Sequence, residues 1–200
     1  MSTVAAPYGF RPINHIGGTP YAGAIRQIPI ASGYATNIFN GTVVSIVGAG
    51  TIQIVTAVGS SGDPFPAGVV GVFVGCSFTT TATGFVHSQY WPTGTVASDA
   101  MAYIVDDPNA LFMVQAAGAV TDNDLGQNCG LNSVQSTSTG STATGNSNIA
   151  MNATTNTVAQ SAFRIVDFVR GPTSAPGDAF TDLVVKFNAG IHAYNNATGI

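Results

Sequence analysis

The side chains that most often perform chemistry in proteins are sparse in this sequence and widely separated. His15, His87 and His192 stand in no HExxH motif and beside no pair of cysteines, so they lack the spacing of zinc ligands. Cys76 and Cys129 form no CxxC motif. We expect both cysteines to be small buried hydrophobic residues, because a disulfide is disfavoured in a reducing compartment. The sequence therefore gives no support for a metal centre.

The acidic residues could bind calcium or catalyse hydrolysis, and all nine of them are aspartates. Asp122 and Asp124 could open a calcium loop, but an EF-hand loop needs glycine at its sixth position and glutamate at its twelfth. Gln127 and Ser133 occupy those positions. Glycoside hydrolysis needs a matched pair of carboxylates, and the sequence singles out no such pair. Turn formation explains these aspartates better than a metal site does.

Motifs of nucleophilic and nucleotide chemistry are missing as well. No serine stands in a GxSxG motif, and Gly48-Ala49-Gly50 joins two predicted strands rather than a strand and a helix. Tyr90, Trp91 and Pro92 could form a patch that stacks on a sugar, although such clusters more often fill a core or an interface. We therefore expect no enzymatic activity and no cofactor.

The low charge of the chain argues against several kinds of partner. Charged residues make up 7% of the sequence, against ~25% in an ordinary soluble domain, and the net charge is -4. Binding to nucleic acid or to anionic lipid requires a basic surface. The longest apolar run, residues 68–76, is about half of the ~20 residues needed to cross a bilayer. We expect no nucleic-acid or membrane partner. The first residues lack the features of a signal peptide, so we also expect synthesis in a cytoplasm.

Composition and periodicity predict an all-β fold. Thr, Val, Ile, Gly, Asn and Ser dominate, whereas the residues that build surface helices are scarce. Short apolar or alternating runs between turn residues predict strands at 41–47, 51–58, 69–78, 85–90, 101–105, 111–114, 163–169 and 183–188. Strands at this spacing predict a β-sandwich or a closed barrel, with a jelly roll as one form.

The stretch from Asp99 to Gln115 is the piece around which we expect the sheets to form. Residues 101–105 and 111–114 are almost wholly apolar, and residues 106–109 between them have the composition of a turn. We therefore expect two strands that pair with each other as a central hairpin. Because both runs are apolar throughout, both of their faces should be covered.

Three segments organise the chain. We predict that residues 1–35 form an extended N-terminal arm, because their prolines forbid a helix and interrupt a sheet ladder. The aromatic and β-branched side chains of this arm must nevertheless be buried on some surface. Residues 36–200 should form a single β domain. Within it, residues 131–148 are rich in Ser, Thr and Asn and predict a polar loop, followed by an exposed strand around Ile149 and Met151.

The arm is the segment in which we predict a binding site. Aromatic and arginine residues are the usual anchors of interfaces, and prolines lower the entropy lost on docking. The predicted binding residues are Pro7, Tyr8, Phe10, Arg11, Pro12, Tyr21 and Arg26. Packing of the arm on its own domain is the alternative interpretation.

Four stretches resemble a known family: residues 6–44, which begin APYGFRP, GVVGVFVGCSF (68–78), AMAYIVDDPNALFMVQ (100–115) and PGDAFTDLVVKFN (176–188). In this order they resemble capsid decoration proteins, also called cement proteins, of tailed bacteriophages. The resemblance implies a structural protein that binds the outside of an icosahedral head. Its partners would be the major capsid protein, of the HK97-like fold, and further copies of itself, commonly in a homotrimer. The N-terminal stretch would be the arm that faces the capsid, and the protein would reside on the virion surface.

Two other functions stay open at this point. The chain could be a minor head protein or a head–tail structural protein, which would be present in far fewer copies per particle. It could also be a carbohydrate-binding β module that uses Tyr90 and Trp91 to stack on sugar rings.

Overall fold

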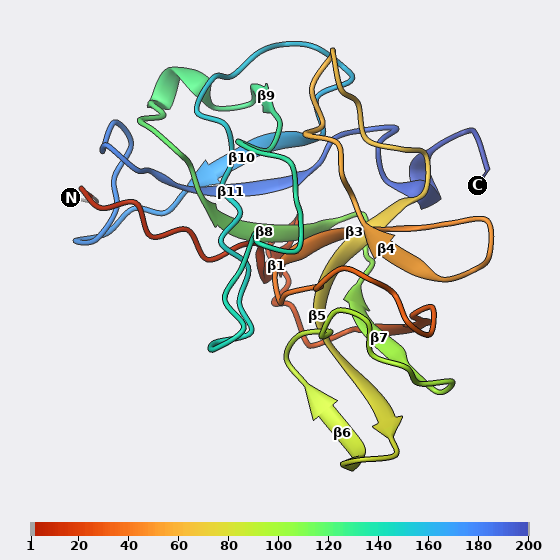
Figure 1. The fold of residues 1–200 in the computed structure, drawn as a ribbon. Helices are drawn as coiled ribbons and strands as arrows, with labels where there is room; N and C mark the ends of the chain where they lie inside the picture. Colours follow the sequence, from red (N-terminus) through yellow and green to blue (C-terminus); the bar gives the residue numbers. More distant parts are fainter. Residues whose placement is uncertain (1–2, 200) are drawn as a thin grey trace.

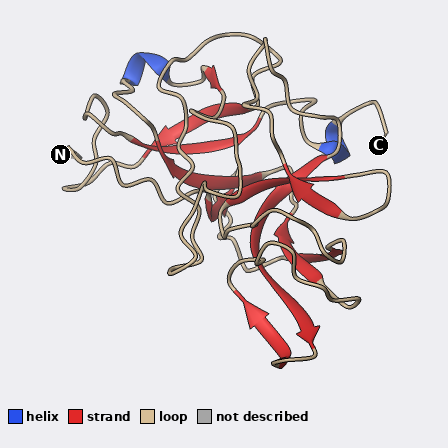
Figure 2. Cartoon of the chain, in the orientation of Figure 1, coloured by secondary structure: helices blue, strands red, loops and turns tan. Residues whose placement is uncertain are grey.

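The fold is a β-sandwich of two antiparallel sheets, and a computed structural model describes residues 3–199 of it (Figures 1 and 2). The first sheet contains, in spatial order, β1 (Arg11–His15), β8 (Ala110–Gln115), β11 (Asp182–Phe187), β10 (Phe163–Phe168) and β9 (Asn128–Cys129). The second contains β2 (Arg26–Pro29), β7 (Met101–Val105), β5 (Val69–Thr80), β3 (Thr42–Ile46) and β4 (Ile52–Ile54), with β6 (Gly84–Ser88) paired to β5. Two short 3-10 helices, η1 (Asp122–Asp124) and η2 (Ala193–Asn195), complete the chain. The predicted all-β sandwich is confirmed.

The main core lies between the two sheets. Alternate residues of a strand point to opposite faces, so each sheet can contribute one apolar face to the space between them. The second sheet contributes Val43, Val72 and Val105, and the first contributes Phe112 and Val185. All five side chains are buried. This core explains the apolar positions that mark both central strands in the sequence.

A second core covers the opposite face of the second sheet. It includes Phe73 of β5 and Ile104 of β7 together with Ile38 and Trp91 from the connecting segments. The middle of this sheet is therefore buried on both faces. That arrangement produces the nearly continuous apolar runs of β5 and β7, in place of simple alternation.

The predicted central hairpin is wrong, although both of its strands exist. β7 pairs with β2 and β5 in the second sheet, whereas β8 pairs with β1 and β11 in the first. Residues 106–109 cross from one sheet to the other, and the Asn109 backbone N–H donates to Asp107 Oδ1 at 2.7 Å. The turn signal was correct, but strands far along the chain occupy both edges of each strand and so prevent their pairing.

The polar segment that follows β9 is mostly exposed, but the apolar residues that come directly after it are buried. Residues 131–148, all of which the structure describes, contain no strand, as expected for a loop. The exposed strand predicted after it is wrong, because Ile149 and Met151 are buried in the main core, and Met151 forms only isolated bridges, to Ala116 and Leu131. Gln135 is also buried, and its side chain bonds to the backbone of Val43.

Two strands of the N-terminal segment belong to the sandwich in this structure. β1 forms one edge of the first sheet and β2 forms one edge of the second. Phe10 lies in the main core with 0% of its surface exposed. Edge strands tolerate proline, and the pairing of β1 is irregular between Pro12 and Asn14. Phe10, Ile28 and Ile30 are buried on their own sandwich, whereas Ile16 and Ile25 are exposed, so the role of residues 1–35 as an arm stays a prediction.

No helix in the described part of the chain is long and apolar enough to cross a membrane.

Candidate functional site

The residues before β1 are held on the sandwich by polar contacts to distant strands. The Ala6 backbone N–H donates to Gln115 Oε1 at 2.8 Å, and the Tyr8 hydroxyl donates to Asp182 Oδ1 at 3.0 Å. Burial and the Asp182 carboxylate raise the pKa of Tyr8 far above its ordinary value. The Arg11 guanidinium lies 4.6 Å from the centroid of the Tyr8 ring. Tyr8 thus stays protonated and serves as a hydrogen-bond donor that fixes this segment.

Phe10 fixes the same segment by packing. Its ring stacks on Phe163 with a centroid distance of 4.8 Å and meets Phe112 edge-on at 6.2 Å. Its backbone N–H donates to the Gly41 carbonyl at 3.0 Å. The preceding Gly9 has φ +73° and lies so close to Gly41 that a Cβ there would be 2.9 Å from the Gly41 oxygen. Only glycine fits this passage of the chain into the core.

A charged cluster joins the two ends of the chain at the turn between β7 and β8. Asp106 Oδ2 accepts from Arg26 Nε at 2.6 Å and from the Tyr194 hydroxyl at 3.1 Å. Asp107 Oδ2 lies 3.1 Å from His15 Nε2. The two aspartates that suggested a turn therefore also anchor β1, β2 and the C-terminal η2 region. The cluster has a structural explanation, because each carboxylate is paired within the fold.

The seven predicted binding residues fall into three groups. Tyr8 and Phe10 face the sandwich, and Tyr21 is half-buried, with its hydroxyl donating to the Ala24 carbonyl at 3.0 Å. Arg11 and Arg26 are exposed, and they belong to the edges of different sheets. Pro7 and Pro12, which flank the other residues of this stretch, form the third group, and both are half-buried. The structure therefore brings the residues 7–12 together but places Arg26 on a separate sheet, and their binding role stays a prediction.

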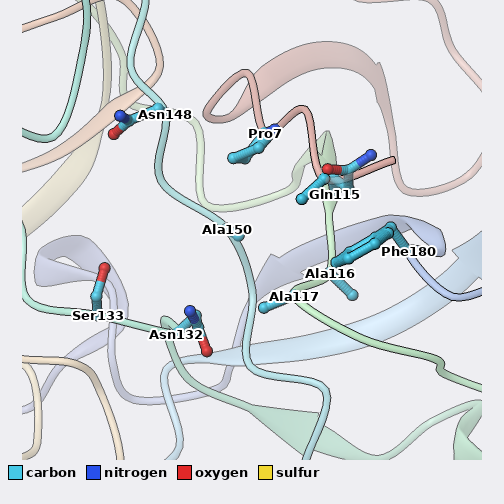
Figure 3. A pocket seen from close by; sticks show the side chains of 10 residues that line it. Pro7, Gln115, Ala116, Ala117, Asn132, Ser133, Asn148, Ala150 and Phe180 are labelled. Carbon is cyan, nitrogen blue, oxygen red and sulfur yellow. The ribbon is translucent and has the colours of Figure 1, made fainter. Parts of the chain in front are cut away.

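An open cavity of about 290 Å³ lies beside the N-terminal segment (Figure 3). Pro7 and Phe180 form part of its apolar wall, while Gln115, Asn132 and Asn148 contribute amide groups. None of its lining residues carries a charge. The cavity has no group for acid–base chemistry, and its composition suits the main chain of a peptide better than a charged ligand.

A projecting hairpin carries the most distinctive surface of the molecule. β5 and β6 extend together beyond the rest of the sandwich (Figure 1). Phe85 of β6 is 62% exposed, and its ring lies 4.9 Å from that of His87, which lies 6.1 Å from Tyr103 of β7. Among the described strands, β6 pairs with β5 alone. We call the row of Phe85, His87 and Tyr103 the hairpin face.

Sequence reasoning predicted a short edge strand at residues 85–90 but missed the hairpin face. The signal was present in the alternation of Phe85 and His87 with Val86. The sequence did not reveal where the partner of β5 changes. β3 pairs with β5 only as far as Phe73, and β6 is the partner of β5 from Cys76 onwards. Because β3 ends there, the β5–β6 hairpin projects beyond the rest of the sandwich (Figure 1).

Trp91 fills the second core, as the favoured interpretation of the Tyr90–Pro92 cluster predicted, and the alternative of a sugar-stacking patch fails for this residue. Its side chain is 0% exposed and meets Phe78 edge-on at 5.3 Å. The indole Nε1 donates to the Tyr34 carbonyl at 3.2 Å. Tyr90 stacks on Phe39 at 5.6 Å. Trp91 is a core residue and offers no face to a sugar.

The groups considered for chemistry are dispersed in the structure as they are in the sequence. Within residues 3–199, no three His, Cys, Asp or Glu side chains are grouped to hold a metal ion. Cys76 and Cys129 are free and buried, and burial raises the pKa of each thiol to about 12. Asp122 accepts from Arg170 at 2.6 Å, and Asp124 accepts from the Thr155 hydroxyl at 2.6 Å.

The fold and surface define the chain as an all-β sandwich with a projecting aromatic hairpin. Comparisons with protein-family models, curated protein sequences and solved structures returned no match.

Proposed function

We propose that this chain is a structural virion protein that decorates and stabilises the icosahedral head of a tailed bacteriophage. It binds the outside of the shell formed by the major capsid protein and acts as a homotrimer. The sequence resemblance, which four stretches carry in order between residues 6 and 188, supports this choice of partner. The hairpin face is the single structural observation that carries the proposal.

The hairpin face has the properties of a surface that is covered in an assembly. Exposed aromatic residues are common anchors of interfaces, because they bury a large area at a small cost in conformational entropy. The outer edge of β6 also presents backbone groups that can pair with a strand of another chain. With only 7% charged residues, the chain has few of the charges that normally keep a surface free of contacts.

The N-terminal residues act in two ways in this proposal. Tyr8 and Phe10 fix the segment on the sandwich by the contacts described above. The exposed Arg11, with the half-buried Pro7 and Pro12 beside it, contacts the capsid. Arg26 lies on a separate sheet edge and contributes to the same contact only where the shell spans both sheets.

Many weak contacts suffice for such a coat. A trimer that touches several capsid subunits at once gains affinity from each additional attachment, because later contacts form within the same complex. A trimer bound to several capsid subunits also opposes their separation, and in this way a decoration protein would stabilise a head.

A binding experiment tests the proposal. Purified protein is mixed with expanded heads that lack it, and the protein that co-sediments is quantified per head. We expect a copy number in the range of a surface lattice, and a Phe85→Ser variant should lose most of the binding. A Leu125→Ser variant, which removes another exposed apolar side chain near η1, should bind normally.

Two outcomes would contradict the proposal. Absence of binding to heads would remove the decoration function. Binding in the few copies typical of a connector would instead identify a minor head or head–tail protein.

A further inference from the structure

We propose that residues 3–21 are exchanged between copies of this chain, so that β1 of one protomer completes the first sheet of the next. The occupant of the site beside β8 is therefore the N-terminal segment of a second copy. This inference rests on the oligomeric part of the proposed function and does not require the capsid.

The site that receives the segment is built entirely by residues far along the chain. β1 pairs with β8 in a register that sets Arg11 opposite Met113 and His15 opposite Ala110. The preceding residues bond to Gln115 and Asp182, as described above. An identical site therefore exists on every copy, and it can accept residues 3–21 from any chain that reaches it.

Residues 15–21 move with β1 in this exchange. They turn back on the strand, since the His15 N–H donates to the Thr19 carbonyl at 2.9 Å and the Tyr21 N–H donates to the Ile13 carbonyl at 3.4 Å. The exchanged unit therefore keeps its own internal hydrogen bonds. Its boundary follows Tyr21, where these backbone bonds end, and the hydrogen bond from the Tyr21 hydroxyl to the Ala24 carbonyl crosses that boundary.

The connection between this unit and β2 has the features of a hinge. Residues 22–25 are all exposed, and a Cβ at Gly23 would meet no atom within 4 Å. In this short span the chain passes from the first sheet to the second, with Gly23 in the left-handed region at φ +78°. Short hinge loops favour exchange, because an extended hinge relieves the reversal that the closed form requires.

β2 stays on its own body in both forms. It pairs with β7, buries Ile28 in the second core, and binds Asp106 through Arg26. β2 therefore anchors the hinge on one side, and the part that moves is the segment on the other side, which contains the edge strand β1. Because the exchanged and closed forms contain the same contacts outside the hinge, the exchange costs little beyond the entropy of association.

Disulfide trapping tests the exchange in the full-length protein. Arg11→Cys and Met113→Cys together place two thiols on opposite strands of the β1–β8 pair, within the Cα separation that a disulfide needs. The oligomer is formed first and then oxidised, and the chains are separated on a denaturing, non-reducing gel. We expect covalent multimers. The native cysteines are buried and should not react.

A second cysteine pair provides the matched control. Gln27→Cys with Tyr103→Cys bridges β2 and β7, on the other side of the hinge. This pair should give a bridge within one chain, and therefore a band of monomer mass, in the same oligomer. A further experiment does not use the double variant. It mixes chains that carry only Arg11→Cys with chains that carry only Met113→Cys. That mixture should also give covalent dimers after joint refolding.

The outcomes separate this inference from the proposed function. An oligomer in which the Arg11–Met113 bridge forms only within single chains would overturn the exchange and leave the decoration function standing. A protein that is monomeric at all concentrations would overturn both the exchange and the proposed trimer. Head binding, which is measured separately, decides the capsid partner.

Discussion

Gln135 illustrates what single residues contribute to this fold and why the sequence did not reveal it. Its Oε1 accepts from the Val43 N–H at 2.8 Å, and its Nε2 donates to the carbonyls of Val43 at 3.0 Å and Val55 at 2.8 Å. The amide is buried and satisfied on both sides. In the sequence it is one polar residue within a Ser/Thr-rich stretch. Its partners lie so far away in sequence that no local pattern could indicate them.

We expect Gln135→Ala to lower the free energy of unfolding by about 1–3 kcal/mol, because it leaves buried backbone groups of Val43 and Val55 without partners. Urea denaturation monitored by fluorescence measures the change. The exposed Gln89, which bonds Asn146 at 2.7 Å, provides the control. Gln89→Ala should stay within about 0.5 kcal/mol of the parent. Equal midpoints for the two variants would show that the Gln135 bonds do not stabilise the fold.

His192 makes stability depend on pH. The side chain is buried, and burial lowers its pKa, an effect that the carboxylates of Asp106 and Asp107 oppose only in part. The ordinary pKa of histidine is about 6.5. Above this pH, the imidazole of His192 is neutral in both the folded and the unfolded chain. Below that value the unfolded chain takes up a proton that the folded chain resists. The free energy of unfolding should therefore fall as the pH falls through this range.

Chemical denaturation between pH 8 and pH 5 tests this expectation. His192→Gln should flatten the decline, because the glutamine does not titrate. The exposed His87 offers the matched change, and His87→Gln should keep the decline of the parent. The same slope in His192→Gln and in the parent would assign the pH dependence to other groups.

At the scale of elements, local pattern predicted strands well and their partners poorly. The bounds predicted for β7 agree with the observed Met101–Val105, and those for β5 and β8 differ by one or two residues. The predicted pairing of the two runs in the central hairpin failed, because strand pairing depends on which distant strands compete for each edge. The short β9, at Asn128–Cys129, was not predicted at all.

The N-terminal strands were missed for a related reason. Prolines and glycines made residues 1–35 read as an arm, but β1 and β2 are edge strands, which leave one side of the backbone unpaired. Proline is tolerated at such edges. Phe10 is buried, as the aromatic content of the segment indicated, but Ile16 and Ile25 are exposed, and composition could not show which surface would cover Phe10.

Phe10 tests whether this segment is part of the sandwich. We expect Phe10→Ala to lower the free energy of unfolding by about 3–5 kcal/mol, because it empties a site in the main core. The neighbouring Arg11 is exposed, and Arg11→Ala should change stability by less than about 1 kcal/mol. Chemical denaturation of both variants measures the contrast. If Phe10→Ala were as mild as Arg11→Ala, the segment would not be packed as the structure places it.

At the scale of the whole molecule, a two-sheet body carries one conspicuous projection. The second sheet is covered on both faces near its middle, and its hairpin extends past the region where β3 supports it (Figure 1). The low charge of the sequence led us to predict a surface that binds a partner. We placed that surface on the N-terminal segment and missed the hairpin face, because the exposure of β6 depends on where β3 ends.

In the proposed function, the hairpin face and the exposed Arg11 of the N-terminal segment are the two surfaces that contact partners. Their relative contribution separates attachment to the capsid from attachment between copies. The proposed exchange of residues 3–21 would place Tyr8 and Phe10 on a neighbouring copy and leave the exposed Arg11 and the hairpin face for the shell.

A cryo-electron microscopy reconstruction of phage heads, with and without added protein, tests attachment to the capsid most directly. We expect additional density of sandwich shape on the outer surface, at the local three-fold positions, with the β5–β6 hairpin touching the capsid. Heads that show no additional density, or density in which the hairpin points into solvent, would contradict decoration through this surface.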